Sequence, residues 1–330
     1  MANYWVTRRR LGPLAIGAAA AAGLVGDLAA QGRKYKYGTA AAPGSISARF
    51  ATRLFELTKE RTKGAVDFDV FANSLGLGEL QLLQGAALGT VDAAGTAATA
   101  TREFDIFYSP YFFRDREHAG KVGNGLLRER ASKVLETKYQ VKLLGVGRAG
   151  PWNLFLRRKI SSFDELKGMK IRAAPIEGQT EGLKHLGAEA VSIAFNELYG
   201  ALQQGIVDGA STLANLGIAQ KFYEVAKYQV TNDFGFGLDK YMISLRTWNG
   251  LAKGDQEILQ RTFDELEPEL YYKTDLAEAP QNLKRWEELN GAGTVVTFEA
   301  SAAQAKMAPL NKKLADEVYG AGTWDQIVKA

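Results

Sequence analysis

Cysteine is absent from the chain of 330 residues, and only two histidines occur in it. The absence of cysteine excludes disulfides, thiol catalysis and thiolate metal sites together. His118 stands in the charged segment RDREHA and His185 beside Lys184 on a predicted helix, two settings typical of solvated side chains. One histidine per region, without cysteine and without a close cluster of acids, does not make a transition-metal site of standard spacing, so we predict neither such a site nor a cofactor.

Charge of one sign is not in marked excess either. Lysine and arginine number 41 against 37 aspartates and glutamates, and the basic residues are interleaved with acidic ones. Nucleic-acid and anionic-membrane binders depend instead on clustered cations that neutralise phosphates, so we expect no nucleic-acid partner. The sequence also lacks a G-x-S-x-G elbow and a G-x-x-x-x-G-K-[ST] loop, which makes an enzyme the weaker interpretation.

A long hydrophobic run is missing, because the apolar stretch from Leu11 to Val25 is too short and too rich in alanine to span a bilayer. Three arginines at 8–10 precede it and small residues follow it, which predicts a cleavable export signal over residues 1–31. Residues 7–11 fit the twin-arginine pattern, although Gly12 leaves ordinary secretion open. Export of a chain without cysteine indicates a Gram-negative periplasm, with no direct membrane insertion of the mature chain.

Alternating strand and helix patterns follow the predicted signal. The region from Tyr35 to Val70 has the pattern strand, helix, strand, with a helix start near Ser45. The segment GTVDAA at 89–94 follows an amphipathic helix, and GIVDGA at 205–210 does the same. Two α/β lobes built alike would produce this echo, and so would chance recurrence of a common helix-to-strand turn.

One long helical pattern runs from about Gly254 to Asn290 and contains two prolines, Pro268 and Pro280. Proline removes a backbone donor and clashes with the preceding turn, so we expect the helix to be kinked or broken there. A long broken helix of this kind suits a spine shared by two lobes.

The segment LLGVGRAGPW contains a G-x-G-x-x-G motif at Gly145, Gly147 and Gly150. This spacing is typical of a dinucleotide-binding loop, which also needs a helix after the third glycine and an acid about twenty residues further on. Here the residues from Trp152 onward alternate as in a strand. We therefore favour a glycine-rich hinge between two lobes over a dinucleotide site.

Arg172 is a candidate ligand-binding residue because of the segment around it. It stands in the short apolar strand KIRAAP, where a charged side chain stays only if solvent, an acid or a bound anion neutralises it. A salt bridge to an acid such as Glu177 is the commoner solution. A ligand carboxylate is the other, because the planar guanidinium matches a carboxylate bidentately.

Between about residues 35 and 315 the chain contains FANSLGLGELQLLQGAALGTVDAA, FDIFYSPYFFRDREHA, SFDELKGMKIRAAP, SIAFNELYGALQQGIVDGA and LAKGDQEILQRTF. These segments resemble the DctP-type solute-binding proteins of TRAP transporters, the tripartite ATP-independent periplasmic systems. The resemblance implies an α/β fold, a two-lobed clamshell of the type II periplasmic-binding kind with a long kinked helix spanning the lobes. Such a protein shuts on an organic acid and delivers it to membrane subunits that an ion gradient drives.

The implied lobe boundaries follow from this resemblance. Lobe I would comprise residues 34–153 and about 240–280, and lobe II residues 154–239 and about 281–330, with the ligand cleft between them. The kinked helix after residue 250 and the crossing segment at 150–158 would act as hinges. The acid would favour the closed state because only there do both lobes touch it.

The resemblance also implies roles for individual residues. In the family, the arginine of the K-I-R strand holds the ligand carboxylate, which is the place of Arg172, and an aromatic residue lines the cleft at the place of Phe195. Where many members carry a second arginine this chain has Trp152, and where asparagine is frequent it has Thr212. Both departures remove polar contacts and Trp152 adds an apolar face, so we expect a carboxylate, such as a monocarboxylate, with an apolar or aromatic body.

Three further residues are candidates. Arg148 would restore a diacid or sugar-acid site if it replaced the missing arginine, and would otherwise be an exposed hinge charge. Asn73 and Thr96 stand at the cleft-facing ends of predicted first-lobe strands, where they would either bind the ligand or form turns.

The sequence thus predicts a periplasmic solute-binding protein that captures an organic acid for the membrane subunits of a TRAP transporter. Two alternatives stay open at this point. One is a periplasmic enzyme that acts on an organic acid and uses the glycine-rich segment as a cofactor loop. The other is a ligand sensor of the same fold.

Overall fold

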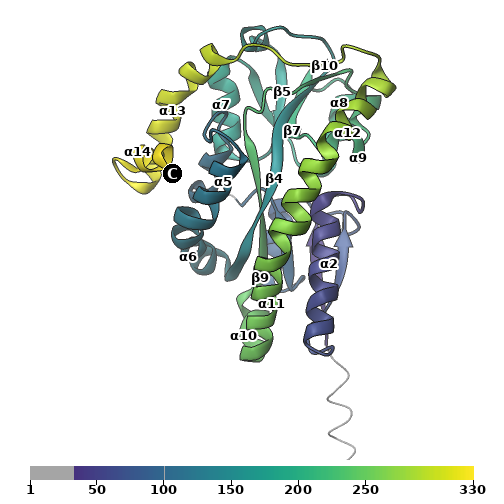
Figure 1. The fold of residues 1–330 in the computed structure, drawn as a ribbon, viewed down its shortest axis with the longest axis vertical. Coiled ribbons are helices and arrows are strands. Elements are labelled where there is room, and N and C mark those ends of the chain that lie inside the picture. Colours follow the sequence, from purple (N-terminus) through teal and green to yellow (C-terminus); the bar gives the residue numbers. More distant parts are fainter. Residues whose placement is uncertain (1–32, 100) are drawn as a thin grey trace, which may run out of the picture. The chain divides into compact units, whose positions relative to one another are not determined.

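The computed structural model describes residues 33–99 and 101–330, so the predicted export signal at 1–31 lies outside the described residues (Figure 1). Strands in this part of the chain join into one mixed, ten-stranded sheet. The strands are β1 (Lys34–Thr39), β2 (Asp67–Ala72), β3 (Ala93–Thr96), β4 (Val141–Leu156), β5 (Lys170–Ala173), β6 (Glu189–Ser192), β7 (Gly209–Leu213), β8 (Tyr228–Val230), β9 (Phe236–Ser244) and β10 (Val295–Val296).

Helices flank the sheet. The α-helices are α2 (Ile46–Arg61), α3 (Glu79–Leu88), α4 (Arg102–Asp105), α5 (Arg116–Val122), α6 (Arg128–Tyr139), α7 (Glu177–Leu186), α8 (Leu198–Gln203), α9 (Leu216–Ala219), α10 (Leu245–Gly250), α11 (Lys253–Leu266), α12 (Lys273–Asn290), α13 (Ser301–Tyr319) and α14 (Thr323–Lys329). Shorter 3-10 turns are η1 (Ile106–Tyr108), η3 (Phe163–Leu166), η4 (Phe195–Glu197) and η5 (Phe222–Glu224), and the π-helical segments are η2 (Gly123–Leu127) and η6 (Glu267–Tyr272). In Figure 1, α5, α6, α7 and α13 lie to one side of β4 and β9, with α2 and α12 to the other.

The sheet consists of two halves with the same order of strands. In the first half β1 pairs in parallel with β2 and β3, and β3 pairs antiparallel with β9. In the second half β5 pairs in parallel with β6 and β7, and β7 pairs antiparallel with β4. The long strands β4 and β9 pair with each other and join the halves, giving the order β2-β1-β3-β9-β4-β7-β5-β6. The order therefore reads alike from either edge, as expected for two lobes built alike.

The Val-Asp echo seen in the sequence has the same structure in both halves. The side chain of Asp92 accepts a hydrogen bond from the backbone N–H of Lys36, with an N to Oδ2 distance of 2.9 Å. The side chain of Asp208 accepts from the backbone N–H of Lys170 at 2.8 Å. In each half a glycine with positive φ ends the preceding helical segment. The echo therefore marks equivalent positions of two similar units and is not a chance recurrence.

The G-x-G-x-x-G segment lies wholly inside β4, and no helix follows its third glycine, so the dinucleotide interpretation is wrong. The glycines are needed for a different reason. A Cβ atom at Gly145, Gly147 or Gly150 would overlap the side chain of Phe263, Tyr271 or Asp275, respectively. These three partners come from α11, η6 and α12, so the glycines let a long helix lie directly on β4.

We expect Gly145→Ala to destabilise the fold by about 1–3 kcal/mol, because the new methyl group must displace the ring of Phe263 from a filled core. The measurement is the free energy of unfolding in urea. Gly44→Ala is the matched control, since nothing lies within 4 Å of a Cβ at Gly44. Equal stability of the two variants would show that the helix does not depend on this contact.

The helix that crosses β4 runs without interruption from Lys253 to Asn290 through α11, η6 and α12. Pro268 lies in the π-helical segment η6, where the wider turn accommodates its missing N–H and its ring, so a local distortion is found where it was predicted. Pro280 does not end α12. The N–H that Pro280 lacks would have bonded to the carbonyl of Leu276, so α12 contains one fewer intrahelical hydrogen bond at this point.

An aromatic cluster fixes this helix to the first half of the sheet. The ring of Phe50 from α2 lies 4.9 Å from that of Tyr241 in β9, and 5.3 and 5.5 Å from those of Phe263 and Tyr271. All three contacts are edge-to-face, the arrangement that aromatic quadrupoles favour. The cluster thereby positions two tyrosines that reach the cavity described below.

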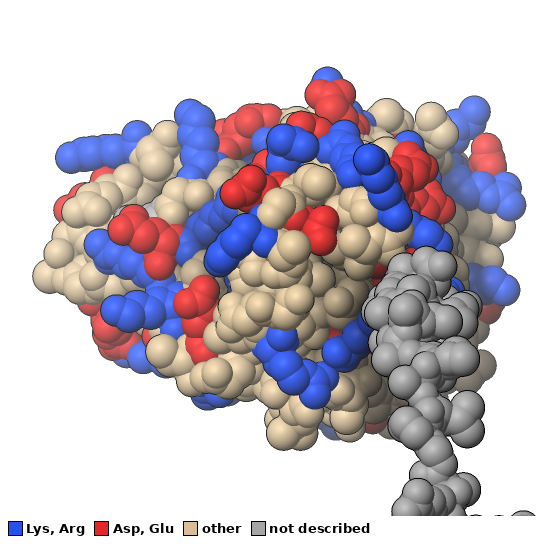
Figure 2. Space-filling model, turned by 90° about the horizontal axis from the view of Figure 1, so that it is seen from below, with Lys and Arg blue, Asp and Glu red and all other residues tan. Residues whose placement is uncertain are grey.

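Basic and acidic side chains alternate on the face of the molecule that Figure 2 shows, without a large patch of either sign. This agrees with the interleaving of charges in the sequence. Among the described residues, the structure contains no helix whose length and apolar character would allow it to cross a membrane.

Candidate ligand-binding site

The candidate site is a cavity at the carboxyl ends of parallel strands from both halves of the sheet. Thr39 and Thr96 are the last residues of β1 and β3, while Arg172 and Thr212 lie near the same ends of β5 and β7, and all four line the cavity. Ligands of α/β proteins bind at such strand ends, where side chains from several elements converge. The repeated topology therefore brings together residues that are far apart in the sequence.

Five of the seven residues proposed from the sequence line this cavity, namely Arg172, Trp152, Phe195, Thr212 and Thr96. Asn73 does not. It is exposed, follows β2 in the left-handed region with φ of 49°, and donates its backbone N–H to the carbonyl of Thr39 at 2.8 Å. Asn73 is therefore a turn former in this structure, which is the alternative that the sequence left open.

Backbone carbonyls on both sides of β5 hold the guanidinium of Arg172. Its Nε donates to the carbonyl of Ile193 at 2.9 Å and its Nη1 to that of Ser211 at 3.3 Å. The guanidinium carbon lies 6.0 Å from the ring centroid of Phe195. Only 1% of the residue is exposed, so the charge is fixed in position and largely removed from water.

The salt bridge considered for Arg172 is not formed. Glu177 accepts instead from Arg102, with the shortest N to O distance at 2.8 Å. Among the described residues, no carboxylate lies within 4.0 Å of the Arg172 guanidinium. Burial lowers the pKa of Arg172 to about 10, an effect that the negative charge of Glu79 opposes. The side chain is still a cation at neutral pH, but a buried one that lacks an adjacent anion.

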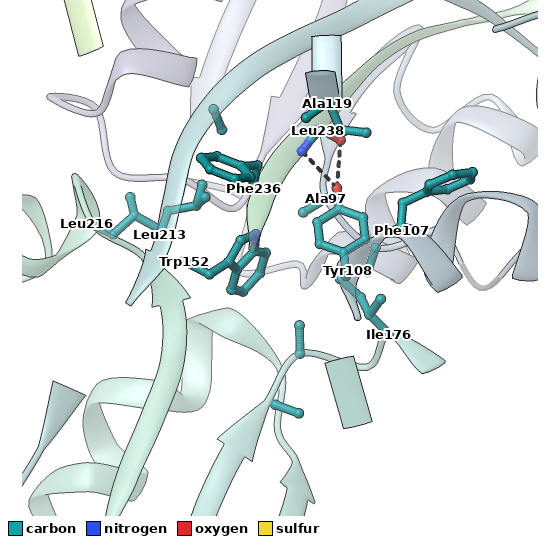
Figure 3. Close-up of a cluster of buried hydrophobic side chains, with 14 of the residues drawn as sticks. Ala97, Phe107, Tyr108, Ala119, Trp152, Ile176, Leu213, Leu216, Phe236 and Leu238 are labelled. Carbon is teal, nitrogen blue, oxygen red and sulfur yellow. Dashed lines mark hydrogen bonds between the residues drawn. The ribbon is translucent and has the colours of Figure 1, made fainter. Parts of the chain in front are cut away.

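Trp152 forms part of the wall beside Arg172. Its indole ring stands edge-on to the ring of Tyr108, with centroids 5.4 Å apart and planes at 89° (Figure 3). The hydroxyl of Tyr108 is in turn fixed by the backbone of Leu238, donating to its carbonyl at 2.6 Å and accepting from its N–H. Within the described chain, the buried Nε1–H of Trp152 has no acceptor. A buried donor without an acceptor costs about 1–3 kcal/mol, which a ligand oxygen would recover.

Thr96 and Thr212, the two threonines proposed from the sequence, are both buried. Thr96 donates its hydroxyl to the carbonyl of Ala98 at 2.8 Å, so only its oxygen lone pairs are available to a ligand. Thr212 stands opposite Asn153 in the register of β7 with β4. Thr212 therefore lines the cavity at the position where the resemblance implies an asparagine, and its side chain is shorter than that of asparagine.

Arg148 does not line the cavity, so it does not supply a second cation there. Its Nε and Nη2 donate to the carboxylate of Glu267 at 2.8–3.1 Å, and its backbone N–H donates to the same group at 2.9 Å. The guanidinium carbon also lies 4.3 Å from the ring centroid of Tyr272. The suggestion of a second arginine failed because the long helix brings Glu267, a partner distant in sequence, next to this strand.

The polar side chains of the lining that were not predicted include Tyr37 and Asn215. Tyr37, in β1, is 1% exposed, and no group in the described chain bonds to its hydroxyl. Gly95 leaves room for that hydroxyl, since a Cβ there would overlap it. Asn215 donates its amide to Asp275 at 2.7 Å, while its buried carbonyl oxygen has no donor among the described residues. The cavity thus contains both a hydroxyl that can donate and a carbonyl oxygen that can accept, and neither has a partner in the described chain.

Two carboxylates also line the cavity, Glu79 from the first turn of α3 and Asp239 from β9. Glu79 accepts from the backbone N–H of Ala97 at 2.7 Å, and Asp239 accepts from the hydroxyl of Tyr271 at 2.5 Å. Burial raises the pKa of Asp239 to about 6. The sequence contained a usable signal, because Asp239 interrupts an apolar strand in the same way as Arg172 does.

A buried lysine, Lys240, lies close enough to these carboxylates to be affected by their charges. Lys240 is fully buried and donates to the carbonyl of Ala97 and, at 2.8 Å, to the hydroxyl of Tyr108. Burial lowers its pKa to about 8, and the charges of Asp105, Glu79 and Asp239 oppose this shift. Lys240 does not line the cavity, so Arg172 is the one cationic side chain among the described lining residues.

Two similar half-sheets with a partly charged, aromatic cavity at their facing strand ends are features of a binding protein that closes on a small solute. No group of three or more His, Asp or Glu side chains in the described residues is placed to hold a metal ion. The chain belongs to the DctP family, bacterial extracellular solute-binding protein family 7, whose model matches residues 37–319. This confirms the resemblance found in the sequence.

Similar proteins support the same assignment. The C4-dicarboxylate-binding periplasmic protein DctP of Rhodobacter capsulatus is 26% identical, over 95% of this chain and 96% of its own length. A TRAP periplasmic solute binding protein from Desulfovibrio salexigens, solved with bound orotic acid, is 25% identical with a TM-score of 0.80 and covers 90% of this chain and 96% of its own. One from Roseobacter denitrificans, solved with bound L-galactonate, is also 25% identical, with a TM-score of 0.79 and coverage of 90% and 97%. The two-lobed α/β fold is thereby confirmed.

Proposed function

We propose that this protein captures an organic acid in the periplasm and delivers it to the membrane subunits of a TRAP transporter. The observation that carries this proposal is the guanidinium of Arg172, which lines the cavity while fully buried and without a carboxylate at ion-pair distance in the described chain. The ligands of the similar proteins, a C4-dicarboxylate, orotic acid and L-galactonate, all carry a carboxylate.

The ligand carboxylate would take the place of the missing counter-ion. Arg172 would bind it, and the unsatisfied Nε1–H of Trp152 is a further donor in the same lining. Phe195 and the face of Trp152 would cover the carbon skeleton, while Thr96 and Thr212 would contribute hydroxyl oxygens. No covalent step is needed, because binding alone accomplishes capture.

Closure would couple binding to transport. The cavity lining comes from both halves of the sheet, so an acid that touches both halves stabilises the closed arrangement over an open one. We propose residues 34–153 and 240–280 as one lobe and residues 154–239 and 281–330 as the other. The strands β4 and β9 and the long helix connect them and would bend, and the membrane subunits would recognise the closed form.

A thermal-shift screen of carboxylates tests the proposal. A ligand present at 100 times its dissociation constant stabilises the folded protein by about 2.7 kcal/mol, which raises the melting temperature measurably. The matched control is the methyl ester of the best acid, which retains the skeleton but not the charge, and should have little effect. If no acid raises the melting temperature, or if the ester does so equally, the proposed function is wrong.

A further inference from the structure

The acidic side of the cavity restricts what else the ligand can carry. Glu79 and Asp239 come from the first half of the sheet, whereas Arg172 comes from the second. A ligand whose carboxylate lies on Arg172 therefore extends toward elements that present negative charge. The lining contains two carboxylates and one cation, so its acidic groups already outnumber its cation before a ligand carboxylate is added.

Neither carboxylate is used up by the protein. Glu79 engages one oxygen with the N–H of Ala97, and Asp239 engages one oxygen with the hydroxyl of Tyr271. The other oxygen of each carboxylate accepts no hydrogen bond from the described residues, and no described cation lies within 4.0 Å of either group. Each therefore offers a free acceptor to the cavity.

Buried groups without partners in the same lining give an independent indication that a polar ligand binds here. The carbonyl oxygen of Asn215 is a buried acceptor without a donor in the described chain. The hydroxyl of Tyr37, in a side chain that is 1% exposed, is similarly unpartnered and can accept as well as donate. Proteins rarely leave such groups unsatisfied, because each costs about 1–3 kcal/mol. Three acceptors, Glu79, Asp239 and Asn215, thus stand in one cavity.

These acceptors disfavour two kinds of ligand. An apolar tail would cover Glu79 and Asp239 without supplying donors, leaving desolvated carboxylates at a high cost. A second carboxylate on the ligand would face two like charges, with Arg172 already engaged at the other end. An apolar or aromatic body, as expected from the sequence, would contact Trp152 and Phe195 but would leave these acceptors unpaired.

We propose that the ligand is a monocarboxylate whose other end carries hydrogen-bond donors, either hydroxyl or ammonium groups, which Glu79, Asp239 and Asn215 receive. This inference rests on the proposed function, because it assumes that Arg172 holds a carboxylate. It assigns the two acids a role in specificity: they select for donors and against a second carboxylate.

A matched series of acids tests the inference on the mature protein by isothermal titration calorimetry. At six carbons the series is hexanoate, 6-aminohexanoate, gluconate and adipate, and at four carbons butanoate, 4-aminobutanoate, threonate and succinate. We expect a hydroxylated or amino acid to bind at least about tenfold more tightly than the unsubstituted acid and the diacid of equal length. Tighter binding of hexanoate, butanoate or a diacid would overturn this inference while leaving the proposed function intact. If no acid binds, both are overturned.

Isosteric variants identify the residues responsible. Glu79→Gln and Asp239→Asn retain an oxygen that can accept from Ala97 and Tyr271, respectively, but remove the negative charge. We expect them to weaken an ammonium ligand by about tenfold or more, to weaken a hydroxylated ligand less, and to improve diacid binding. A larger loss of affinity for the amino acid than for the hydroxylated acid would show that the carboxylates bind an ammonium group through their charge.

Glu269→Gln is the matched control for these variants. Glu269 is exposed and pairs with Lys273 on the surface of the long helix, so its charge should not alter the selectivity. The inference is wrong if Glu79→Gln and Asp239→Asn, like this control, do not change the affinity for the amino or hydroxylated acid relative to that for the unsubstituted acid and the diacid.

Discussion

Arg172→Met is expected to lower the affinity for the acid by roughly 30-fold to several thousand-fold. The variant removes the one cation among the described lining residues, and truncating one partner of a buried, hydrogen-bonded charge pair costs about 2–5 kcal/mol. Isothermal titration calorimetry with the best ligand of the screen measures the change. Arg285→Met, which removes an exposed arginine that pairs with Glu288, should leave the affinity unchanged.

Urea denaturation of ligand-free Arg172→Met tests whether a loss of binding is caused by misfolding. The lowered pKa of Arg172 shows that burial disfavours its charge in the ligand-free fold. Methionine of similar length removes that unfavourable charge, so the ligand-free variant should unfold at an equal or higher urea concentration than the parent. A variant that is equally stable and still binds the acid with the parent's affinity would contradict the assigned role of Arg172.

Arg116→Met is expected to destabilise the protein by about 3–5 kcal/mol at neutral pH. Arg116 of α5 and Asp275 of α12 form a buried ion pair with an N to O distance of 3.0 Å, and 8% and 4% of the respective side chains are exposed. Removing the arginine leaves an uncompensated buried carboxylate, the costly half of such a pair. Urea denaturation measures the loss. Lys273→Met, which breaks an exposed pair with Glu269, should change stability by less than about 1 kcal/mol.

The pH dependence of Arg116→Met provides a second criterion. Burial already raises the pKa of Asp275 above its usual value, while Arg116 lowers it, so the variant should raise it further. A carboxyl with a raised folded-state pKa stabilises the fold below its unfolded pKa, and that contribution is lost as the pH rises through the folded value. The destabilisation should therefore shrink under mildly acidic conditions. The double variant Arg116→Met with Asp275→Leu should regain stability at neutral pH. If the destabilisation neither shrinks in acid nor is relieved by Asp275→Leu, the buried ion pair does not explain the effect of Arg116→Met.

The parts of the fold that the sequence predicted are those that local patterns determine. The strand and helix at Lys34–Arg61 follow from alternation and from Ser45, which accepts the N–H of Ala48 at 3.3 Å as the helix cap. Arg172 was recognisable because a charge in an apolar strand requires a compensating partner or ligand. The lobe boundaries and the roles of the lining residues stay predictions.

Contacts between distant segments account for the errors. The glycines of β4 have the spacing of a dinucleotide loop, but that spacing arises here because a helix more than one hundred residues further along the chain lies on the strand. The sequence left Arg148 as either a second ligand-binding arginine or an exposed hinge charge, because its partner Glu267 is 119 residues away. Single-sequence patterns contain no information about which helix crosses which strand.

The polar lining was missed for a related reason. Tyr37 and Tyr241 stand in strands among apolar residues, so each is indistinguishable from a core aromatic until the neighbouring strand is known. Asp239 is the exception, since the rule that selected Arg172 applies to it equally. That rule identifies Asp239 in β9 but not Glu79, which lies on the helix α3.

The repeated Asp-to-Lys hydrogen bond aligns the two half-sheets residue by residue. Lys36 and Lys170 occupy equivalent places, so Gly38 is the counterpart of Arg172, two residues further along each strand. No side chain fits at Gly38 without displacing Leu82. A near-symmetric scaffold thus has an arginine in one half only. Under the proposed function this asymmetry would give the bound solute a fixed polarity, with its carboxylate bound by the second half of the sheet and its other end contacted by the first.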